Sequence, residues 1–343
     1  METTLIATDS GARPTNGSLI APLRPVADGL AAVDRELAES IPESLGLISR
    51  ASRTILQSGG KRLRPALVLL TARAFGGVNA RAVKVASALE MVHAASLLHD
   101  DVVDNTQTRR GRATLGAWWS NKIAIMLGDY MYAKSLLDMC GDENRYLVTI
   151  VSEATGRMCL GQIRELEEQN NFDVTLEDYL FIIREKTAAL MAASSRLGAI
   201  VADASRESID AMAEYGMQLG MAFQIVDDVL DYWGDEGLLG KPVGSDLGER
   251  KFTLPFIYTL QRLPADERAV LRALVEEGRN RLSRRTVRRA RAMMDGVGAR
   301  EHAMAVASEY AARARAALAV ARPHQEGAEA LELLVDFVLD RRA

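Results

Sequence analysis

The stretch NARAVKVASALEMVHAASLLHDDVVD, residues 79–104, decides the fold, because apolar residues recur in it three and four positions apart. Residues with this spacing lie on one face of an α-helix, so the pattern predicts a helix. The same spacing recurs in residues 143–168, 175–205 and 207–233, and aromatic residues make up only 5% of the chain. We find no stretch that alternates polar and apolar residues as a strand would. The sequence therefore predicts an all-α protein.

We expect a single domain boundary, which lies near the start of the chain. Residues 1–26 mix Thr, Ser, Gly, Asn and Pro without hydrophobic periodicity, which predicts a flexible N-terminal tail. After residue 26 no linker rich in proline or serine divides the 343 residues. We expect residues 27–343 to form a single large helical domain.

Composition excludes several classes of function. Lys and Arg number 42 against 46 Asp and Glu, so the net charge of -4 offers no general attraction for nucleic acid, which is not expected as a partner. The basic run 279–291 is interpreted as a solvated helix face. We find neither a run of about 18 apolar residues nor a targeting peptide, so we expect a cytoplasmic protein without a transmembrane segment. The two cysteines, Cys140 and Cys159, are expected to be small buried hydrophobic residues.

Two helical segments repeat the pattern Asp-Asp-x-x-Asp: LLHDDVVD, which ends at Asp104, and FQIVDDVLD, which ends at Asp231. Residues four apart lie on one helix face about 6 Å apart, so Asp100 should project beside Asp104, and Asp227 beside Asp231. Grouped carboxylates repel one another unless a cation lies there. A single copy fits an ordinary solvated face, but two copies in apolar helices favour Mg²⁺, which binds through one or two carboxylates together with substrate phosphates.

Basic side chains suited to phosphate occur in GGKRLRP, which opens a helix with glycines, and in TRRGR, which follows the first acidic motif. Arginine binds phosphate oxygens in a bidentate manner, and the N–H groups of a helix start bind anions. His93, two helical turns before Asp100, lies on the same face as that motif. Together with a long apolar interior, these features predict a site for a diphosphate whose other end is a hydrocarbon. The basic candidates are Lys61, Arg62, Arg64, Arg109, Arg110 and Arg112, with weaker individual candidates at Lys186, Thr187, Gln224, Lys241 and Lys251.

Five segments in order, GGKRLRP, HDDVVDNTQTRRGRAT, REKTAAL, FQIVDDVLDYWGD and GKPVGSDLGERKFTLP, resemble the motifs of the trans-isoprenyl diphosphate synthase family. The resemblance extends over roughly residues 27–341. It implies helices packed around a central cavity, a homodimer, and three Mg²⁺ ions. It also implies a prenyltransferase that condenses isopentenyl diphosphate with an allylic diphosphate by ionisation, condensation and elimination.

The resemblance also implies a role for each matched residue. Isopentenyl diphosphate would be held by Lys61, Arg64, His93 and Arg110. The allylic diphosphate would be held by Arg109, Lys186, Thr187, Gln224 and Lys241. The principal metal ligands would be Asp100, Asp104 and Asp227, which form the catalytic set together with Lys186 and Arg109. Adjacent helical residues point about 100° apart, so the remaining acids of the motifs are expected to reach a metal through water: Asp101, Asp228 and Asp231.

Product length is expected to depend on Ala95 and Ser96, which lie just before the first acidic motif, where the growing chain must pass. Relatives with short products resemble this stretch but carry Phe or Tyr. The small residues therefore predict a long all-trans polyprenyl diphosphate, made from farnesyl or geranylgeranyl diphosphate. The floor of the channel is expected from the helix that contains Met126, Met131 and Tyr132.

Other interpretations stay open at this point. One is a short-chain farnesyl or geranylgeranyl diphosphate synthase. Another is a non-catalytic partner subunit of a heteromeric synthase, although such partners commonly lose the acidic motifs that are intact here. A terpene cyclase would typically replace the second acidic motif and would not need GGKRLRP.

Overall fold

The computed structural model describes residues 20–341 except 42–43, 45, 57–61, 110–111, 237–242 and 278–281. It confirms the all-α prediction, and the strands β1 (Thr108–Arg109) and β2 (Arg112–Ala113) form one short antiparallel pair. The helical elements are α1 (Ile20–Leu23), η1 (Arg24–Val26), α2 (Ala27–Glu39), α3 (Leu47–Leu56), α4 (Leu63–Phe75), α5 (Ala80–Val103), α6 (Leu115–Trp118), α7 (Asn121–Cys140), α8 (Tyr146–Glu168), α9 (Leu176–Ile183), η3 (Arg184–Ala188), α10 (Ala189–Val201), α11 (Arg206–Trp233), α13 (Ser245–Gly248), α14 (Leu254–Arg262), α15 (Ala265–Glu277), α16 (Arg284–Gly296), α17 (Ala299–Ala321) and α18 (Gln325–Asp340).

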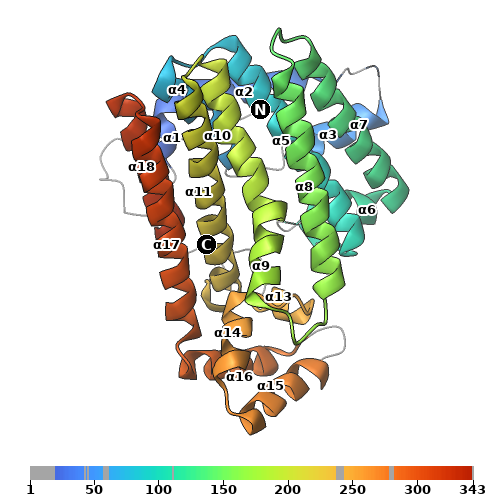
Figure 1. The fold of residues 1–343 in the computed structure, drawn as a ribbon. Helices are drawn as coiled ribbons and strands as arrows, with labels where there is room; N and C mark the ends of the chain where they lie inside the picture. Colours follow the sequence, from blue (N-terminus) through green and yellow to red (C-terminus); the bar gives the residue numbers. More distant parts are fainter. Residues whose placement is uncertain are drawn as a thin grey trace, which may run out of the picture.

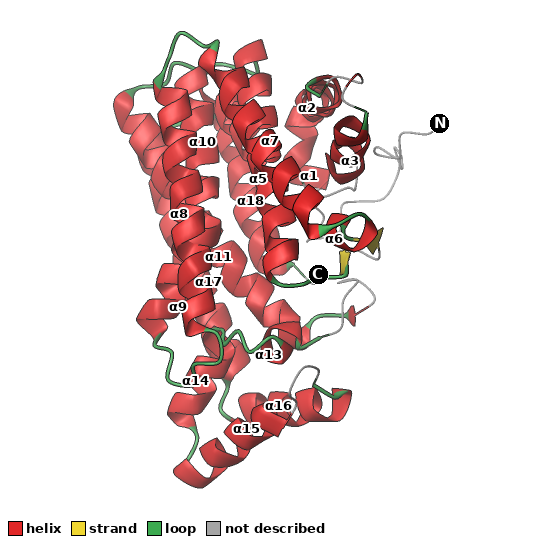
Figure 2. Ribbon diagram, turned by 90° about the vertical axis from the view of Figure 1, so that its right-hand side faces the viewer, coloured by secondary structure: helices red, strands yellow, loops and turns green. Residues whose placement is uncertain are grey.

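The long helices run side by side, and α13, α14, α15 and α16 gather at one end of the bundle (Figures 1 and 2). Helix α11 packs against both α10 and α17, and α10 continues the contacts to α4 and α8. Helix α5 packs against α4 and α7. The two helices that carry the acidic motifs, α5 and α11, therefore each lie among several neighbours.

Helix starts follow local signals in the sequence. The side chain of Asn79 accepts a hydrogen bond from the N–H of Ala82 at the start of α5. Ser205 caps α11 in the same way through the N–H of Ser208. Such caps satisfy N–H groups that have no partner within the helix, which is why both helices begin where they do.

Helix α17 presents a row of buried alanines and packs against α11 more extensively than any other pair of described elements. Alanine side chains are short enough to let two helix backbones approach closely. The members of this row are Ala299, Ala303, Ala307, Ala311, Ala314, Ala317 and Ala321.

Two expectations need correction. Residues 20–26 were placed in the flexible tail, but they form α1 and η1, and Val26 is buried in the core. Helix α1 packs against α18, and η1 packs against α4. Residues 1–19 lie outside the described part of the chain. Cys140 and Cys159 are exposed rather than buried, since both lie on outward faces of their helices. In the described residues, no helix is both long and apolar enough to cross a membrane.

Candidate active site

A polar cleft of about 170 Å³ lies between α8, α9, η3, α11 and residues 246–253. Its lining residues include several that carry chemistry that binds ions or phosphate: Glu165, Glu168, Lys186, Thr187, Gln224, Asp228, Asp246 and Lys251. Three of them, Lys186, Thr187 and Gln224, were predicted to hold the allylic diphosphate. The structure therefore brings together residues from segments far apart in the sequence.

The first acidic motif closes α5, which ends at Val103 with Asp104 as its C-cap. Asp100 and Asp104 are half-buried, whereas Asp101 is buried, as expected when adjacent residues of a helix point in different directions. The Oδ1 of Asp104 lies 3.2 Å from the Nζ of Lys251. A lysine thus supplies positive charge to this motif, which connects it to the polar cleft.

The second acidic motif lies in the last two turns of α11. The side chain of Asp227 is 33% exposed and pairs with Arg341 across 2.7 Å. Asp231 is only 1% exposed, and its carboxylate accepts hydrogen bonds from the Ser245 hydroxyl and the Asp246 N–H. The expected open pair of Asp227 and Asp231 is therefore not present, because Asp231 anchors the chain that follows α11. The role of Asp231 in metal binding stays a prediction.

Asp228 is the centre of a buried hydrogen-bond network. It accepts hydrogen bonds from the hydroxyl of Tyr179 at 2.6 Å and from the amide of Gln224 at 2.8 Å. Gln224 in turn accepts from the hydroxyl of Thr187 at 2.8 Å. Burial raises the pKa of Asp228 to about 7, although the bonds from Tyr179 and Gln224 oppose the rise. The network fixes Gln224 and Thr187 at the edge of the cleft.

Glu165 joins the two lysines of the cleft, and sequence reasoning missed it. Its Oε2 lies 2.6 Å from the Nζ of Lys186 and 3.8 Å from that of Lys251. Burial opposes ionisation, yet the charges of Lys186 and Lys251 lower the pKa of Glu165. Burial likewise opposes the charge of Lys251, but Glu165, Glu249 and Asp104 raise the pKa of Lys251. Glu165 lies in the acidic run RELEE, where nothing in the sequence distinguishes it.

Lys186 and Thr187 lie in η3, a single π-helical turn between α9 and α10. Such turns inside longer helices occur frequently at functional sites. Helix α8 approaches this turn at Gly161, where an added Cβ would lie 2.5 Å from the backbone nitrogen of Lys186. Beside it, Glu185 accepts hydrogen bonds from both Nε and Nη2 of Arg157, at 2.5 and 3.0 Å. These contacts define where Lys186 projects.

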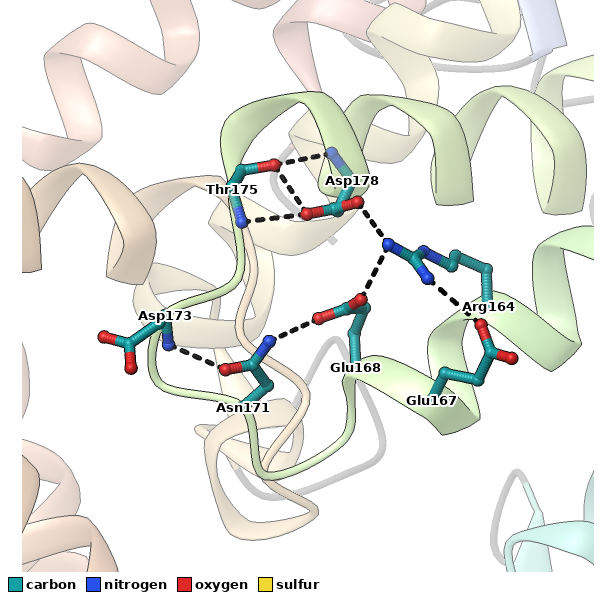
Figure 3. Close-up of polar contacts among 7 residues, drawn as sticks. All are labelled: Arg164, Glu167, Glu168, Asn171, Asp173, Thr175 and Asp178. Atoms are coloured by element: carbon teal, nitrogen blue, oxygen red, sulfur yellow. Dashed lines mark hydrogen bonds and ion pairs between the residues drawn. The ribbon is translucent and has the colours of Figure 1, made fainter.

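A second set of ion pairs joins α8 to α9 (Figure 3). Arg164 bonds to Asp178 at 2.7 Å and to Glu168 at 2.9 Å. Asp178 also completes a capping box with Thr175 at the start of α9. Within the connecting loop, Asn171 donates to Glu168 at 2.6 Å. The start of α9, and with it the η3 turn that follows, is therefore tied to α8.

Arg62, directly before α4, serves the fold. Arg62 has a left-handed backbone, with φ of 47°, and pairs with Asp34 at 3.0 Å and Glu90 at 2.6 Å. It also donates to the carbonyl of Leu56. Arg62 is therefore engaged by the protein itself, and it joins the start of α4 to α2 and α5.

Arg64 and His93 were predicted to hold isopentenyl diphosphate. Burial lowers the pKa of Arg64, while the charges of Glu90 and Asp227 oppose this shift. The Nε of Arg64 is buried without a hydrogen-bond partner among the described residues. His93 is half-buried on α5, two turns before the first acidic motif. Arg64 thus lies within electrostatic reach of the second acidic motif, which links the two halves of the predicted site.

Four predicted ligands are not placed by the structure. Lys61, Arg110 and Lys241 lie outside the described residues, and Arg109 belongs to β1 but its side chain is not described. Their assignments stay predictions.

The residues predicted to control product length lie in α5 and α7. Ala95 is buried in the core, and the hydroxyl of Ser96 donates to the carbonyl of His93. Neither residue lines the polar cleft. Met131 is buried, whereas Met126 is 62% exposed and so does not close a channel within a single chain.

The donor chemistry fits magnesium. Within the described residues, no group of three or more His, Cys, Asp or Glu side chains is placed to hold an ion alone. The acids of both motifs instead contact cations of the protein, Lys251 at Asp104 and Arg341 at Asp227. An ion bound through one or two carboxylates needs further oxygens from water or a phosphorylated ligand, which is the habit of Mg²⁺. Asp100, Asp104 and Asp227 are the residues that would hold it.

An all-α bundle with two aspartate-rich helices beside basic side chains defines the isoprenoid synthase class. The fold is similar to that of a solved decaprenyl diphosphate synthase from Rhodobacter capsulatus, with a TM-score of 0.88 and 34% identity over 95% of this chain and 100% of that one. It is also similar to that of a polyprenyl synthase from Caulobacter crescentus CB15 complexed with calcium and isoprenyl diphosphate, with a TM-score of 0.89 and 34% identity over 96% of this chain and 100% of that one.

The polyprenyl synthetase family model matches residues 46–294, so the chain belongs to this family and is a prenyltransferase. It is 44% identical over 244 residues to the heptaprenyl diphosphate synthase component 2 of Geobacillus stearothermophilus. The matched segment covers 71% of this chain and 75% of that relative. It is 37% identical over 316 residues to a short chain isoprenyl diphosphate synthase of Methanothermobacter thermautotrophicus. The matched segment covers 90% of this chain and 95% of that relative.

Proposed function

We propose that the protein is a long-chain all-trans polyprenyl diphosphate synthase that extends farnesyl or geranylgeranyl diphosphate with isopentenyl diphosphate. The observation that carries the product length is the small, buried Ala95 five residues before Asp100 on α5. A Phe or Tyr at this position would occupy space that a growing chain needs. The heptaprenyl and decaprenyl synthases among the relatives support a long product, whereas the short chain relative supports the alternative.

In the proposed reaction the C–O bond of the allylic diphosphate breaks, and its electron pair leaves with the diphosphate. Lys186 and Lys251 line the cleft where they would stabilise this developing negative charge. Three magnesium ions held by Asp100, Asp104 and Asp227 would supply further positive charge at the leaving group. The double bond of isopentenyl diphosphate then forms the new C–C bond with the allylic carbon. A proton is lost to an oxygen of the departing diphosphate.

A product-length assay tests the proposal. Purified protein is given Mg²⁺, isopentenyl diphosphate and allylic starters of ten, fifteen and twenty carbons, and product lengths are read by chromatography. We expect extension of the fifteen-carbon starter by several units. Products that stop at fifteen or twenty carbons would instead identify a short-chain synthase.

Variants at the proposed gate sharpen the assay. Ala95→Phe or Ser96→Tyr should shorten the product while the first condensation continues, because bulk before the acidic motif blocks only the longer chain. Lys84→Phe is the matched control, since Lys84 is exposed near the other end of α5. An unchanged long product in both gate variants would show that the chain does not pass this part of α5.

We further propose a homodimer built on α7 and α8. Both helices expose large apolar side chains, and the two helices contact each other. Light scattering should report twice the 37.4 kDa of one chain, and Leu160→Glu should weaken the association. Activity that appears only after a second, different protein is added would support a heteromeric synthase instead, as the name of the component 2 relative suggests. The exposed large apolar residues of the two helices are Ile125, Met126, Leu137, Tyr146, Leu160, Ile163 and Leu166.

We also propose a cytoplasmic location, because both diphosphate substrates are charged and do not cross a lipid bilayer unaided. Cell fractionation with an antibody against the protein tests this assignment.

A further inference from the structure

Glu165, on α8, lines the polar cleft and contacts the ammonium groups of two lysines with a single oxygen. Its Oε2 lies 2.6 Å from the Nζ of Lys186 and 3.8 Å from the Nζ of Lys251. The two nitrogens therefore lie no more than 6.4 Å apart, which is the sum of these distances. Like charges this close repel each other, and the shared carboxylate offsets the repulsion. The side chain of Glu165 is only 17% exposed, so solvent screens its charge only in part.

Contacts other than those of Glu165 join α8 to its neighbours at this point. Arg157 forms two hydrogen bonds with Glu185 of η3, and the backbones of α8 and η3 approach closely at Gly161. Arg164 ties α8 to α9. Glu165 instead faces the cleft together with both lysines. Its charge therefore acts on any anion that these lysines bind.

Three carboxylates compete for the positive charge of the two lysines. Besides Glu165, the Nζ of Lys251 lies 3.2 Å from the Oδ1 of Asp104 and 2.8 Å from the Oε2 of Glu249. Asp104 is a predicted metal ligand, so a bound ion would offset its charge. The side chain of Glu249 is 48% exposed, so solvent screens it. Glu165 is shielded from solvent and belongs to neither acidic motif, so its charge continues to act on Lys186 and Lys251 when metal is bound.

We propose that Glu165 is a positioning residue that promotes the release of diphosphate after each condensation. The inference rests on the proposed function, in which every condensation leaves one inorganic diphosphate beside Lys186 and Lys251. The carboxylate and the diphosphate have the same sign of charge and compete for the same two ammonium groups. This competition weakens the binding of diphosphate, and Glu165 regains both lysines when the diphosphate leaves. Release of product limits turnover in many enzymes, so such a competitor increases the rate of a synthase that repeats its reaction.

The variant Glu165→Gln removes the charge and retains the size of the side chain. In isothermal titration calorimetry with Mg²⁺, inorganic pyrophosphate should bind about tenfold more tightly than in wild type, since a like charge beside it is gone. In rapid-quench kinetics, the variant should complete one condensation per enzyme in a burst and then slow about tenfold, because release becomes limiting. The matched control is Glu167→Gln, from the same acidic run on α8, whose 59% exposed side chain pairs with Arg164 (Figure 3). Both measurements on the control should match wild type.

Each outcome decides for or against the inference. Unchanged or weaker pyrophosphate binding in Glu165→Gln would overturn it, since Glu165 would then only support the lysines. Tighter binding without a burst would refute the role in release. Glu165→Asp keeps the charge and should bind pyrophosphate within about twofold of wild type. This variant tests the proposal even if Glu165→Gln does not fold, because strongly tightened binding in it would contradict the argument from charge. Wild-type protein that neither binds pyrophosphate nor condenses the two substrates would instead contradict the proposed function.

Discussion

Replacing Gly161 by alanine should disturb the active site without replacing any predicted ligand. A Cβ at this position would lie 2.5 Å from the backbone nitrogen of Lys186, whereas ordinary contacts begin at 3.4 Å. The η3 turn and α8 must therefore separate by about 0.9 Å. A displacement of about 1 Å at a positioning group costs on the order of 100-fold in rate. We expect a loss of that size in kcat/KM for the allylic substrate.

The stability of the Gly161→Ala variant combines two opposing effects. Overpacking costs about 1–3 kcal/mol, while replacing glycine in a helix interior returns about 1 kcal/mol. The free energy of unfolding should therefore fall by at most about 2 kcal/mol, and the variant should fold. Gly296→Ala is the matched control, because no atom lies within 4 Å of its added Cβ.

Steady-state kinetics with each substrate varied in turn, together with urea unfolding, measures both effects. The Michaelis constant for the allylic diphosphate should rise more than that for isopentenyl diphosphate, because η3 carries Lys186 and Thr187. Wild-type kinetics for both substrates in a folded Gly161→Ala protein would refute the reasoning, since the close approach of α8 would then not determine where Lys186 lies.

Three further predictions concern single side chains. Asp227→Ala should retain the fold but lose nearly all turnover and weaken Mg²⁺ binding in calorimetry, and full activity in EDTA-treated buffer would contradict the metal assignment. The hydrogen bond from Arg81 lowers the pKa of Asp142, so this pair stabilises the protein above pH 3.8 and its contribution is lost as the pH falls further. Between pH 6 and pH 3, urea unfolding should show that the free energy of unfolding falls by about 1 kcal/mol more in wild type than in Asp142→Asn. Tyr179→Phe removes a buried donor from Asp228 and should lower the free energy of unfolding by about 1–3 kcal/mol, whereas unchanged denaturant midpoints would show that the bond is dispensable.

The sequence was sufficient for features that depend on nearby residues. Helical spacing predicted α5 and α11, and it predicted that Asp100 and Asp104 point differently from Asp101. Periodicity also gave the fold class, because each long helix carries its own apolar pattern. These features need no knowledge of how distant segments meet.

Features that depend on distant contacts could not be predicted in this way. Glu165 acquires its role only when α8 meets η3 and the segment that carries Lys251. Asp231 looks like a metal ligand in the sequence, but the returning chain at Ser245 uses its carboxylate. Arg341 is 114 residues from Asp227, and no local pattern connects them.

The predictions for the two cysteines and for residues 20–26 were wrong for a related reason. Composition alone does not say which face of a helix meets a neighbour, so Cys140 and Cys159 were assigned to the interior. Residues 20–26 are too few to show a helical period, and they are ordered by packing of α1 against α18.

The alanine row of α17 limits how α17 can pack against its neighbours. Alanine has no side-chain rotamers, so packing this row costs no side-chain conformational entropy on the α17 side and leaves that side no alternative packing. Larger side chains on α17 could exchange between rotamers, whereas alanine offers a single packing arrangement on that side. The backbone of α11, which carries Asp227, is therefore held by a neighbour that has no side-chain freedom of its own along this row.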